Sequence, residues 1–473
     1  MADINPGPGG GGAGGLTVYD GDLYFSANDL AGGNNTELWR YDGATTTLAA
    51  EIRPGTSGSS PSGLTVYNDK LYFAARGASG PTRLYQYDGA SASVVSTEFQ
   101  GPEEFTLFDG KLFFRGTDFA IPKTGTELWK ISGAGPPVLI DLVPGAGTSL
   151  PKQFVEYGGS LYFNSRQELW KLNAAASGAT QVTDIANGQG SSPEHPVVFN
   201  NDIYFSAYDH VNGRELWRYN GGAPVMVADI KPGGQYDSGN PSGMTVYNDA
   251  IYFTADNGVH GAELWRHDGA VTEMVANINA TAPPSGGEDP EHHAWPMDFF
   301  VFGGLLYFAA DDGIHGRELW SCNGETVSLV ADIYPGRYGS SVGGFAVYNE
   351  RLYFSANNGQ LGGELHTYND AAGLFLLTAP PQPGDTNNDR IVDSEDYNNL
   401  VAQFGGPPGL ASADFNLDDI VDLEDFAILR DNFGFGLASA PDIAPGATAP
   451  LPATLVLLVG GLPLLLKRKR HKQ

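Results

Sequence analysis

Short apolar runs alternate with turn-forming residues along most of the chain, and one arrangement of them keeps returning. Residues 203–205 (Ile-Tyr-Phe) and 216–219 (Leu-Trp-Arg-Tyr) are joined by a short loop rich in Asn and Gly. Aromatic and β-branched residues in two short runs, separated by turn formers, predict a β-hairpin. The same two runs recur within residues 23–39, 251–265 and 306–320. The sequence therefore predicts a scaffold made of copies of one hairpin.

The hairpin occurs eight times, with a period close to that of propeller blades. The phenylalanine of its first run stands at Phe25, Phe73, Phe114, Phe163, Phe205, Phe253, Phe308 and Phe354. The spacings are 48, 41, 49, 42, 48, 55 and 46 residues, which is typical of propeller blades rather than of helical repeats. In the fifth copy, four strands are predicted at residues 196–199, 203–206, 215–219 and 225–230. A pair of Asn, Asp or Gly residues joins the first two strands in nearly every copy, as a two-residue hairpin turn requires.

One four-stranded sheet cannot bury both of its faces, whereas a closed ring of such sheets can. We therefore predict a mainly β fold, an eight-bladed β-propeller over residues 16–378, with seven blades and one displaced unit as the alternative. Tyr85 and His366 occupy one third-strand position in two copies. In the other six copies the same position holds a tryptophan: Trp39, Trp129, Trp170, Trp217, Trp265 and Trp320. A large flat side chain at a fixed position in each unit is predicted to pack between blades.

The repeats also resemble a known family. Residues 215–221 (Glu-Leu-Trp-Arg-Tyr-Asn-Gly) and 37–43 (Glu-Leu-Trp-Arg-Tyr-Asp-Gly) are similar to the ELW…DGT, or hyalin-like, repeat of bacterial extracellular proteins. The resemblance covers about three quarters of the chain. It implies an extracellular setting and a repeat fold, but no particular activity, because function belongs to sites and not to folds.

Composition narrows the possible partners. The chain has 26 basic and 55 acidic residues, a formal net charge of −29, so a nucleic acid held through its phosphates is not expected. The acidity favours solubility and divalent cations. Cys322 is the only cysteine, which excludes an intramolecular disulfide. It follows a Glu-Leu-Trp run and is expected to be a packed or solvated thiol.

Two acidic loops follow a proline-rich linker at residues 379–384, and they carry the sharpest chemical signal of the sequence. Loop positions 1, 3, 5, 9 and 12 are oxygen ligands in both loops, namely Asp385, Asn387, Asp389, Asp393 and Asp396, then Asp414, Asn416, Asp418, Asp422 and Asp425. Position 7, Ile391 or Ile420, would offer its backbone carbonyl. A hard cation takes six to eight oxygen ligands, so the sequence predicts two Ca²⁺ sites. Helical patterns follow at residues 397–404 and 426–433 and end at Gly405 and Gly434.

Residues 385–434 resemble a type I dockerin. Three features carry the resemblance: Asp at position 12, a helix only after each loop, and an offset of 29 residues between the loops (414 − 385). It implies a small α-helical domain folded around two Ca²⁺ ions that binds a cohesin-type protein. Arg390 and Asp419 stand at position 6, where the family usually has Gly. Because a left-handed conformation costs a non-Gly residue about 1–2 kcal/mol, we expect weakened calcium binding, with the second loop the better site.

The chain ends in a linker (residues 435–448) and an apolar segment with a basic tail (residues 449–473). The 18 uncharged residues 449–466 would form a transmembrane helix about 27 Å long. The cluster at residues 467–470 (Lys-Arg-Lys-Arg) predicts a cytoplasmic tail and an external propeller. The segment resembles a PEP-CTERM sorting signal, with Leu451 where the family has Glu. The resemblance implies exosortase-type processing of an exported, membrane-anchored, cell-surface protein.

The start of the chain shows no signal-peptide pattern. Residues 3–7 (Asp-Ile-Asn-Pro-Gly) match residues 229–233 and 332–336, which close later repeats. The Gly-rich residues 1–15 therefore correspond to the tail of a repeat. We expect a truncated or misassigned start, because a protein bound for export would carry a leader.

No catalytic signature accompanies the repeats. Nucleophile-elbow, zincin, phosphate-loop and dinucleotide motifs are absent from the sequence, and the Trp pattern does not match that of quinoprotein propellers. His292 and His293 are a weak candidate for a metal-binding pair. The residues His210, His260 and His315 are expected to be exposed turn residues. The favoured hypothesis is a non-catalytic propeller that binds a partner or surface glycan. The alternative is a polysaccharide-active enzyme, a glycoside hydrolase or lyase, which an inward-facing carboxylate pair at the axis would favour.

Overall fold

The structure is a computed structural model, and it describes residue 4, residues 10–29, 35–118, 125–145, 147–280, 293–359, 362–369 and 373–376, and five helical residues, Tyr397, Leu400, Val401, Phe426 and Leu429. The chain divides into two compact units, one of Met1–Tyr368 with Leu374–Thr378 and one of Asn369–Gly373 with Ala379–Gln473. The predicted calcium ligands and residues 449–473 lie outside the described residues. Within the described part, no helix is long and apolar enough to cross a membrane.

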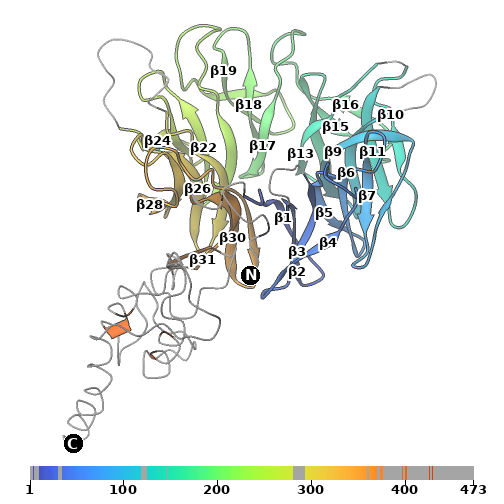
Figure 1. The fold of residues 1–473 in the computed structure, drawn as a ribbon. Helices are drawn as coiled ribbons and strands as arrows, with labels where there is room; N and C mark the ends of the chain where they lie inside the picture. The colour runs from blue at the N-terminus through green and yellow to red at the C-terminus, as the bar shows by residue number, and fades with distance from the viewer. Residues whose placement is uncertain are drawn as a thin grey trace, which may run out of the picture. The chain divides into compact units, whose positions relative to one another are not determined.

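The described part of the first unit consists of eight four-stranded sheets, each a sequential antiparallel meander (Figure 1). The strands of the first four sheets are β1 (Gly14–Tyr19), β2 (Asp22–Asn28), β3 (Thr36–Tyr41), β4 (Thr46–Ala50); β5 (Ser62–Tyr67), β6 (Lys70–Arg76), β7 (Thr82–Tyr87), β8 (Ala92–Val94); β9 (Phe99–Phe108), β10 (Lys111–Asp118), β11 (Thr126–Ser132), β12 (Val138–Ile140); β13 (Lys152–Tyr157), β14 (Ser160–Ser165), β15 (Glu168–Leu172) and β16 (Ala179–Gln181).

The remaining four sheets repeat this order. Their strands are β17 (Glu194–Phe199), β18 (Asp202–Tyr208), β19 (Arg214–Tyr219), β20 (Val225–Ala228); β21 (Ser242–Tyr247), β22 (Ala250–Asp256), β23 (Ala262–His267), β24 (Thr272–Ala276); β25 (Met297–Phe302), β26 (Leu305–Asp311), β27 (Arg317–Cys322), β28 (Val327–Ala331); β29 (Gly343–Tyr348), β30 (Arg351–Asn357), β31 (Gly363–Asn369) and β32 (Gly373–Leu376).

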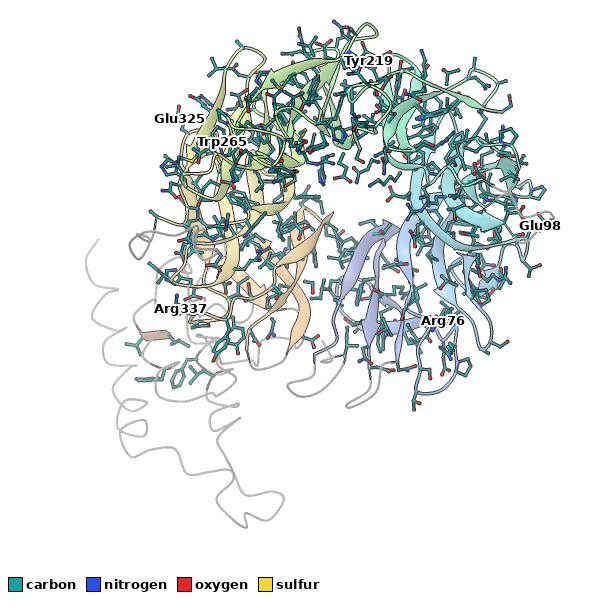
Figure 2. The ribbon with its side chains drawn as sticks, turned by 90° about the horizontal axis from the view of Figure 1, so that it is seen from above. Arg76, Glu98, Tyr219, Trp265, Glu325 and Arg337 are labelled. Atoms are coloured by element: carbon teal, nitrogen blue, oxygen red, sulfur yellow. The ribbon has the colours of Figure 1, made fainter. Side chains whose placement is uncertain are left out.

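The sheets form a closed ring of eight blades, so the prediction of eight rather than seven is confirmed. The first strand of each sheet contacts the first strands of its neighbours, and β1 contacts β29 to close the circle. Viewed from above, the blades surround a common axis, with Arg76 in the blue blades and Tyr219 and Trp265 across the ring (Figure 2). First strands therefore lie nearest the axis, and fourth strands lie at the rim.

Local sequence explains each blade. The two residues between the first and second strands are both left-handed, for example Asp20 (φ 47°) with Gly21 (φ 82°) and Asn200 (φ 46°) with Asn201 (φ 62°). Positive φ at both central positions defines the type I′ turn, whose twist matches that of the flanking strands. This is the turn that the Asn, Asp and Gly pairs predicted.

The hydrophobic core lies between the blades and not within one of them. Each of eight buried clusters draws side chains from two neighbouring blades. Trp39 packs against the cluster shared by the first and eighth blades, and Trp129 belongs to the cluster shared by the second and third. Inter-blade packing of the repeated tryptophan is therefore confirmed. Cys322 is fully buried in the cluster of the sixth and seventh blades.

Residues near the start of the chain pack against the eighth blade. Ile4 joins the same cluster as Leu365. The Gly11 amide donates to Glu364 Oε1 at 2.5 Å, and the Gly12 amide donates to the Gly363 carbonyl at 2.6 Å. Gly10 has φ +61°, and a Cβ there would lie 2.3 Å from the Gly363 amide nitrogen, so only glycine fits this approach. The start of the repeat array thus contacts its last blade.

Candidate functional site

The glutamate of each Glu-Leu-Trp run has a structural role that the sequence analysis missed. Glu215 is fully buried, and its two carboxyl oxygens accept the amides of Ile230 at 2.7 Å and Gly239 at 2.6 Å. These amides belong to the segment that crosses to the next blade. The Ile230 bond also explains why β20 ends at Ala228 and not at residue 230 as predicted.

Six other blades use the same contact. Their glutamates are at most 4% exposed and accept N–H or O–H groups from a crossing segment: Glu37, Glu127, Glu168, Glu263, Glu318 and Glu364. Burial raises the pKa of Glu215 and of Glu263 to about 7, against the opposing effect of their backbone hydrogen bonds. Because their oxygens are already occupied by the protein, these buried acids hold the scaffold together and are not exposed to a ligand.

The second blade reverses the polarity of this contact. Arg83 stands where the other blades have glutamate, and its Nη1 donates to the carbonyls of Thr97 at 2.8 Å and Phe99 at 2.6 Å. The crossing segment here lacks the Asp-Ile-x-Pro-Gly pattern. This crossing segment presents backbone carbonyls to position 83, so the guanidinium of Arg83 stands where the other blades have a glutamate carboxyl.

Near the axis, every first strand carries a β-bulge with a left-handed residue, at the second strand position in seven blades and inside β9 in the third. We call these eight residues the bulge ring: Gly15, Gly63, Glu104, Gln153, His195, Gly243, Asp298 and Gly344, with φ between 54° and 68°. Glycine adopts this conformation freely, whereas other residues pay about 1–2 kcal/mol, less for Asp and His. The third, fourth, fifth and seventh blades therefore hold strained polar residues where the other blades have glycine.

Three of these polar residues form a chain across neighbouring blades. Glu104 Oε2 accepts the Gln153 amide at 2.9 Å, and Gln153 Oε1 accepts the His195 amide at 2.9 Å. Each side chain thus reaches the equivalent backbone position one blade further on. The hydrogen bonds hold the left-handed conformation in place, as strained positions require.

Charged side chains flank this chain. Lys152 Nζ lies 2.8 Å from Glu194 Oε1, and Arg214 Nη1 lies 3.6 Å from Glu194 Oε2. Burial alone would raise the pKa of Glu194, but the Lys152 hydrogen bond and the Arg214 charge bring it below its ordinary value. Burial lowers the pKa of His195. On this side of the axis, burial thus disfavours the charged form of the His195 imidazole, and two cations compensate the Glu194 carboxylate beside it.

The residue two places before the first strand is left-handed in most blades, as Ser60, Leu150 and Asn240 show, and the seventh blade places a tryptophan there. Trp295 is left-handed (φ 44°) and 46% exposed, at the position where the first blade has Gly12 and the second has Ser60. A bulky residue with positive φ is a conformational outlier. Three residues later Asp298 occupies the bulge ring, and burial raises its pKa although Arg317 opposes the shift. An exposed indole and a carboxyl of raised pKa therefore lie at the same strand start.

The histidines that the sequence analysis singled out lie in different surroundings. His210, His260 and His315 lie in hairpin loops as predicted, but they are half-buried and not exposed. His315 Nδ1 lies 2.8 Å from Asp312. His293 Nδ1 accepts the Ala262 amide at 2.7 Å, whereas His292 is outside the described residues. Among the residues that the structure describes, no three His, Cys, Asp or Glu side chains gather as a metal site would require.

Comparisons with known proteins identify no family for this chain. No family model matches the chain, and no curated protein matches it. Similar solved structures include puromycin hydrolase, with 12% identity, a TM-score of 0.41, and coverage of 73% of this chain and 58% of that chain. A puromycin-hydrolyzing peptidase of Mycobacterium tuberculosis has 12% identity, a TM-score of 0.42, and coverage of 75% and 61%.

A third structure is the β-propeller domain of the Trilobed protease from Pyrococcus furiosus, with 11% identity, a TM-score of 0.40, and coverage of 68% of this chain and 96% of that domain. This chain thus spans about 58% of the length of the puromycin hydrolase that it matches.

Proposed function

We propose that the propeller is a non-catalytic body of the ELW-repeat type that binds a glycan at the bulge ring and at Trp295. The observation that carries the proposal is the distribution of strained residues. Glycine would remove the strain at all eight positions of the ring, yet four blades hold polar side chains there, and one of them adds the exposed indole. Strain of this kind clusters at functional sites.

The chemistry of these groups suits a polyhydroxylated ligand. Trp295 offers a flat apolar face with a polar edge. Gln153, His195 and Asp298 supply hydrogen-bonding groups near the axis, whereas the charges of Lys152 and Glu194 offset one another. A ligand that combines hydroxyls with apolar ring faces matches this mixture better than a strongly charged polymer does.

An enzyme that cleaves polysaccharides is the alternative, and the carboxylates of this region bear on it. Glycoside hydrolysis requires one protonated and one ionised carboxyl facing each other. Glu103 pairs with Arg115, and Glu194 pairs with Lys152 and Arg214. The pKa of Glu194 is lowered and that of Asp298 is raised. This pattern favours binding over cleavage.

The test is gel retardation of the full-length protein in dextran, xylan and a soluble cellulose ether. Retardation by at least one of them is expected. Trp295→Gly should abolish it, and Tyr236→Ala, a change at an 89% exposed aromatic outside the ring, should leave it intact. No retardation by any polymer, or equal effects of the two variants, would refute the proposal. Release of reducing sugar ends would instead select the enzyme.

We further propose that residues 385–434 form a calcium-dependent dockerin that binds a cohesin-type protein. The helical residues Tyr397 and Phe426 are 29 positions apart, like the two loops, and their ring centroids are 6.3 Å apart. Leu400 and Leu429, also 29 apart, are 1% and 0% exposed. Equivalent side chains of two tandem units thus pack together or are buried alike, as a pseudo-symmetric pair of loop–helix units requires.

The donor set of both loops, five carboxylate or amide oxygens and one carbonyl, is the chemistry that Ca²⁺ prefers. Calorimetric titration of the full chain with CaCl₂ should show binding that Asp414→Ala weakens more than Asp385→Ala. A chain that takes up no heat and gains no helix on calcium addition would refute the dockerin. Residues 449–473 are proposed to anchor the protein at the cell surface, and fractionation of membranes from cells expressing the chain tests this anchoring.

A further inference from the structure

A polar cavity of about 360 Å³ lies beside the bulge ring, where the second blade meets its neighbours. Its walls come from the segment that leaves the first blade, from β6 and β7 of the second, and from the start of β9 in the third. Its lining includes Arg53, Ser57, Ser60, Arg76, Thr82 and Glu103. Its volume is within the range of about 300–1,000 Å³ that small-ligand sites occupy.

Two arginines in this cavity stand at positions that form a salt bridge elsewhere in the ring. Arg53 directly follows Ile52, whose amide Glu37 accepts, and Arg76 ends β6. The matching residues between the fifth and sixth blades are Lys231, which follows Ile230, and Asp256, which ends β22; Lys231 Nζ lies 3.1 Å from Asp256 Oδ2. The repeat geometry thus brings these two positions together. Between the first and second blades it brings together two cations.

Among the described residues, no salt bridge joins Arg53 or Arg76 to an acidic side chain. Arg53 Nη1 donates only to the Gly58 carbonyl, at 3.4 Å. Glu103 is the one acidic residue of the cavity wall, and it forms an ion pair with Arg115 instead. Like charges placed together are unfavourable, and solvent screens this pair only in part, because Arg53 is half-buried although Arg76 is exposed. In a chain whose net charge is −29, a local concentration of positive charge indicates an anionic ligand.

We propose that this cavity binds the carboxylate of an acidic sugar unit. Guanidinium groups match planar carboxylates through paired N–H donors. The hydroxyls of Ser57, Ser60 and Thr82 can serve sugar hydroxyls, and the cavity is larger than one inorganic anion needs. The inference deepens the proposed function and rests on it: a glycan that crosses the bulge ring would place one acidic unit between Arg53 and Arg76.

The test measures binding of sodium glucuronate to the full chain by calorimetry and by melting temperature, at constant ionic strength set with sodium chloride. Glucose and sodium phosphate are the comparison ligands. Glucuronate should bind and raise the melting temperature, and glucose should not. Arg53→Ala should weaken glucuronate binding by about tenfold or more, the equivalent of one charge-assisted hydrogen bond.

Arg76→Asp is the decisive variant, because it restores the opposite charges of the Lys231–Asp256 pair. It should abolish glucuronate binding and raise the melting temperature of the free protein. Lys231→Ala is the matched control and should bind glucuronate normally. Phosphate binding as tight as glucuronate binding, or an Arg76→Asp protein that still binds, would overturn the inference. Retardation by neutral polymers without glucuronate binding would refute the inference but leave the proposed function intact. Glucuronate binding without retardation by any polymer would refute only the proposal that the bulge ring binds a glycan.

Discussion

Arg83→Glu gives the second blade the glutamate that the seven other blades carry. A consensus argument would expect it to stabilise the protein, because repeat residues are usually those that suit the fold. The structure predicts the reverse. The carboxylate would face the Thr97 and Phe99 carbonyls, which now accept hydrogen bonds from Arg83, and like partial charges would replace matched ones.

The expected loss of stability follows from the two hydrogen bonds that Arg83 donates and that the substitution removes. Hydrogen bonds from charged groups contribute about 1.5–3 kcal/mol each. Arg83 is half-buried and its bond to Thr97 is exposed, so solvent screening places each bond near the low end. We expect the free energy of unfolding to fall by about 2–4 kcal/mol. Arg83→Met removes the bonds but adds no negative charge, and it should cost about half as much.

The assay is equilibrium urea unfolding followed by tryptophan fluorescence, with wild type, Arg83→Glu and Arg83→Met compared at one pH. The slope with urea should be equal in the three proteins, so that midpoints report stability. A midpoint for Arg83→Glu equal to or above that of wild type would show that the crossing segment can turn amides toward position 83, and the argument from fixed acceptors would fail.

Three further predictions concern the same scaffold. Glu263→Ala leaves the amides of Ile278 and Asn279 without their acceptor, and should lower the free energy of unfolding by about 2–5 kcal/mol, whereas Glu263→Gln, which keeps one acceptor, should cost less in the same urea assay. Burial raises the folded-state pKa of Glu215 and Glu263 to about 7, above about 4.3 for the unfolded chain. The contribution of these two groups to the free energy of unfolding is therefore full below pH 4.3 and is lost as pH rises through 7. The urea midpoint should be higher at pH 5.5 than at pH 7.5, and a midpoint that rises with pH would contradict this. Asp298→Gly relieves left-handed strain that is less than about 1–2 kcal/mol for Asp, and it adds about 0.5–1 kcal/mol of chain entropy to the unfolded state. The two effects should nearly cancel in the urea midpoint while the substitution weakens retardation by glycans; a midpoint lowered by more than the entropy cost would show that Asp298 is not strained.

The blade could be predicted in detail because its signals are local. Residues 203–205 and 216–219 pair within β18 and β19, and the turn pair Asn200–Asn201 is adjacent to both strands that it joins. A period of about 48 residues is also visible without any structure, so the chain alone predicted the inter-blade position of the tryptophans and eight blades, with seven as the alternative that ring closure excluded.

Part of the site was visible in the sequence but was not recognised. Glutamate precedes Leu-Trp in copy after copy, with Arg83 as the exception, and this constancy could have indicated a buried acceptor. Its partners could not have been named, because the amides of Ile230 and Gly239 lie 15 and 24 residues from Glu215. The alternation of Asp and Asn in residues 385–396 and 414–425 remains a prediction of two calcium sites.

The sequence by itself determined the repeat, the strands, the turns and the core between blades, because periodicity and turn chemistry act over a few residues. Only the tertiary structure decided where the strained residues of the bulge ring gather, that Glu104, Gln153 and His195 form one chain, and that Arg53 and Arg76 share a cavity. These features depend on which blades are neighbours and on the backbone conformation at each strand start. Ring closure brings together residues that are separated by a whole repeat, and no local pattern records that contact.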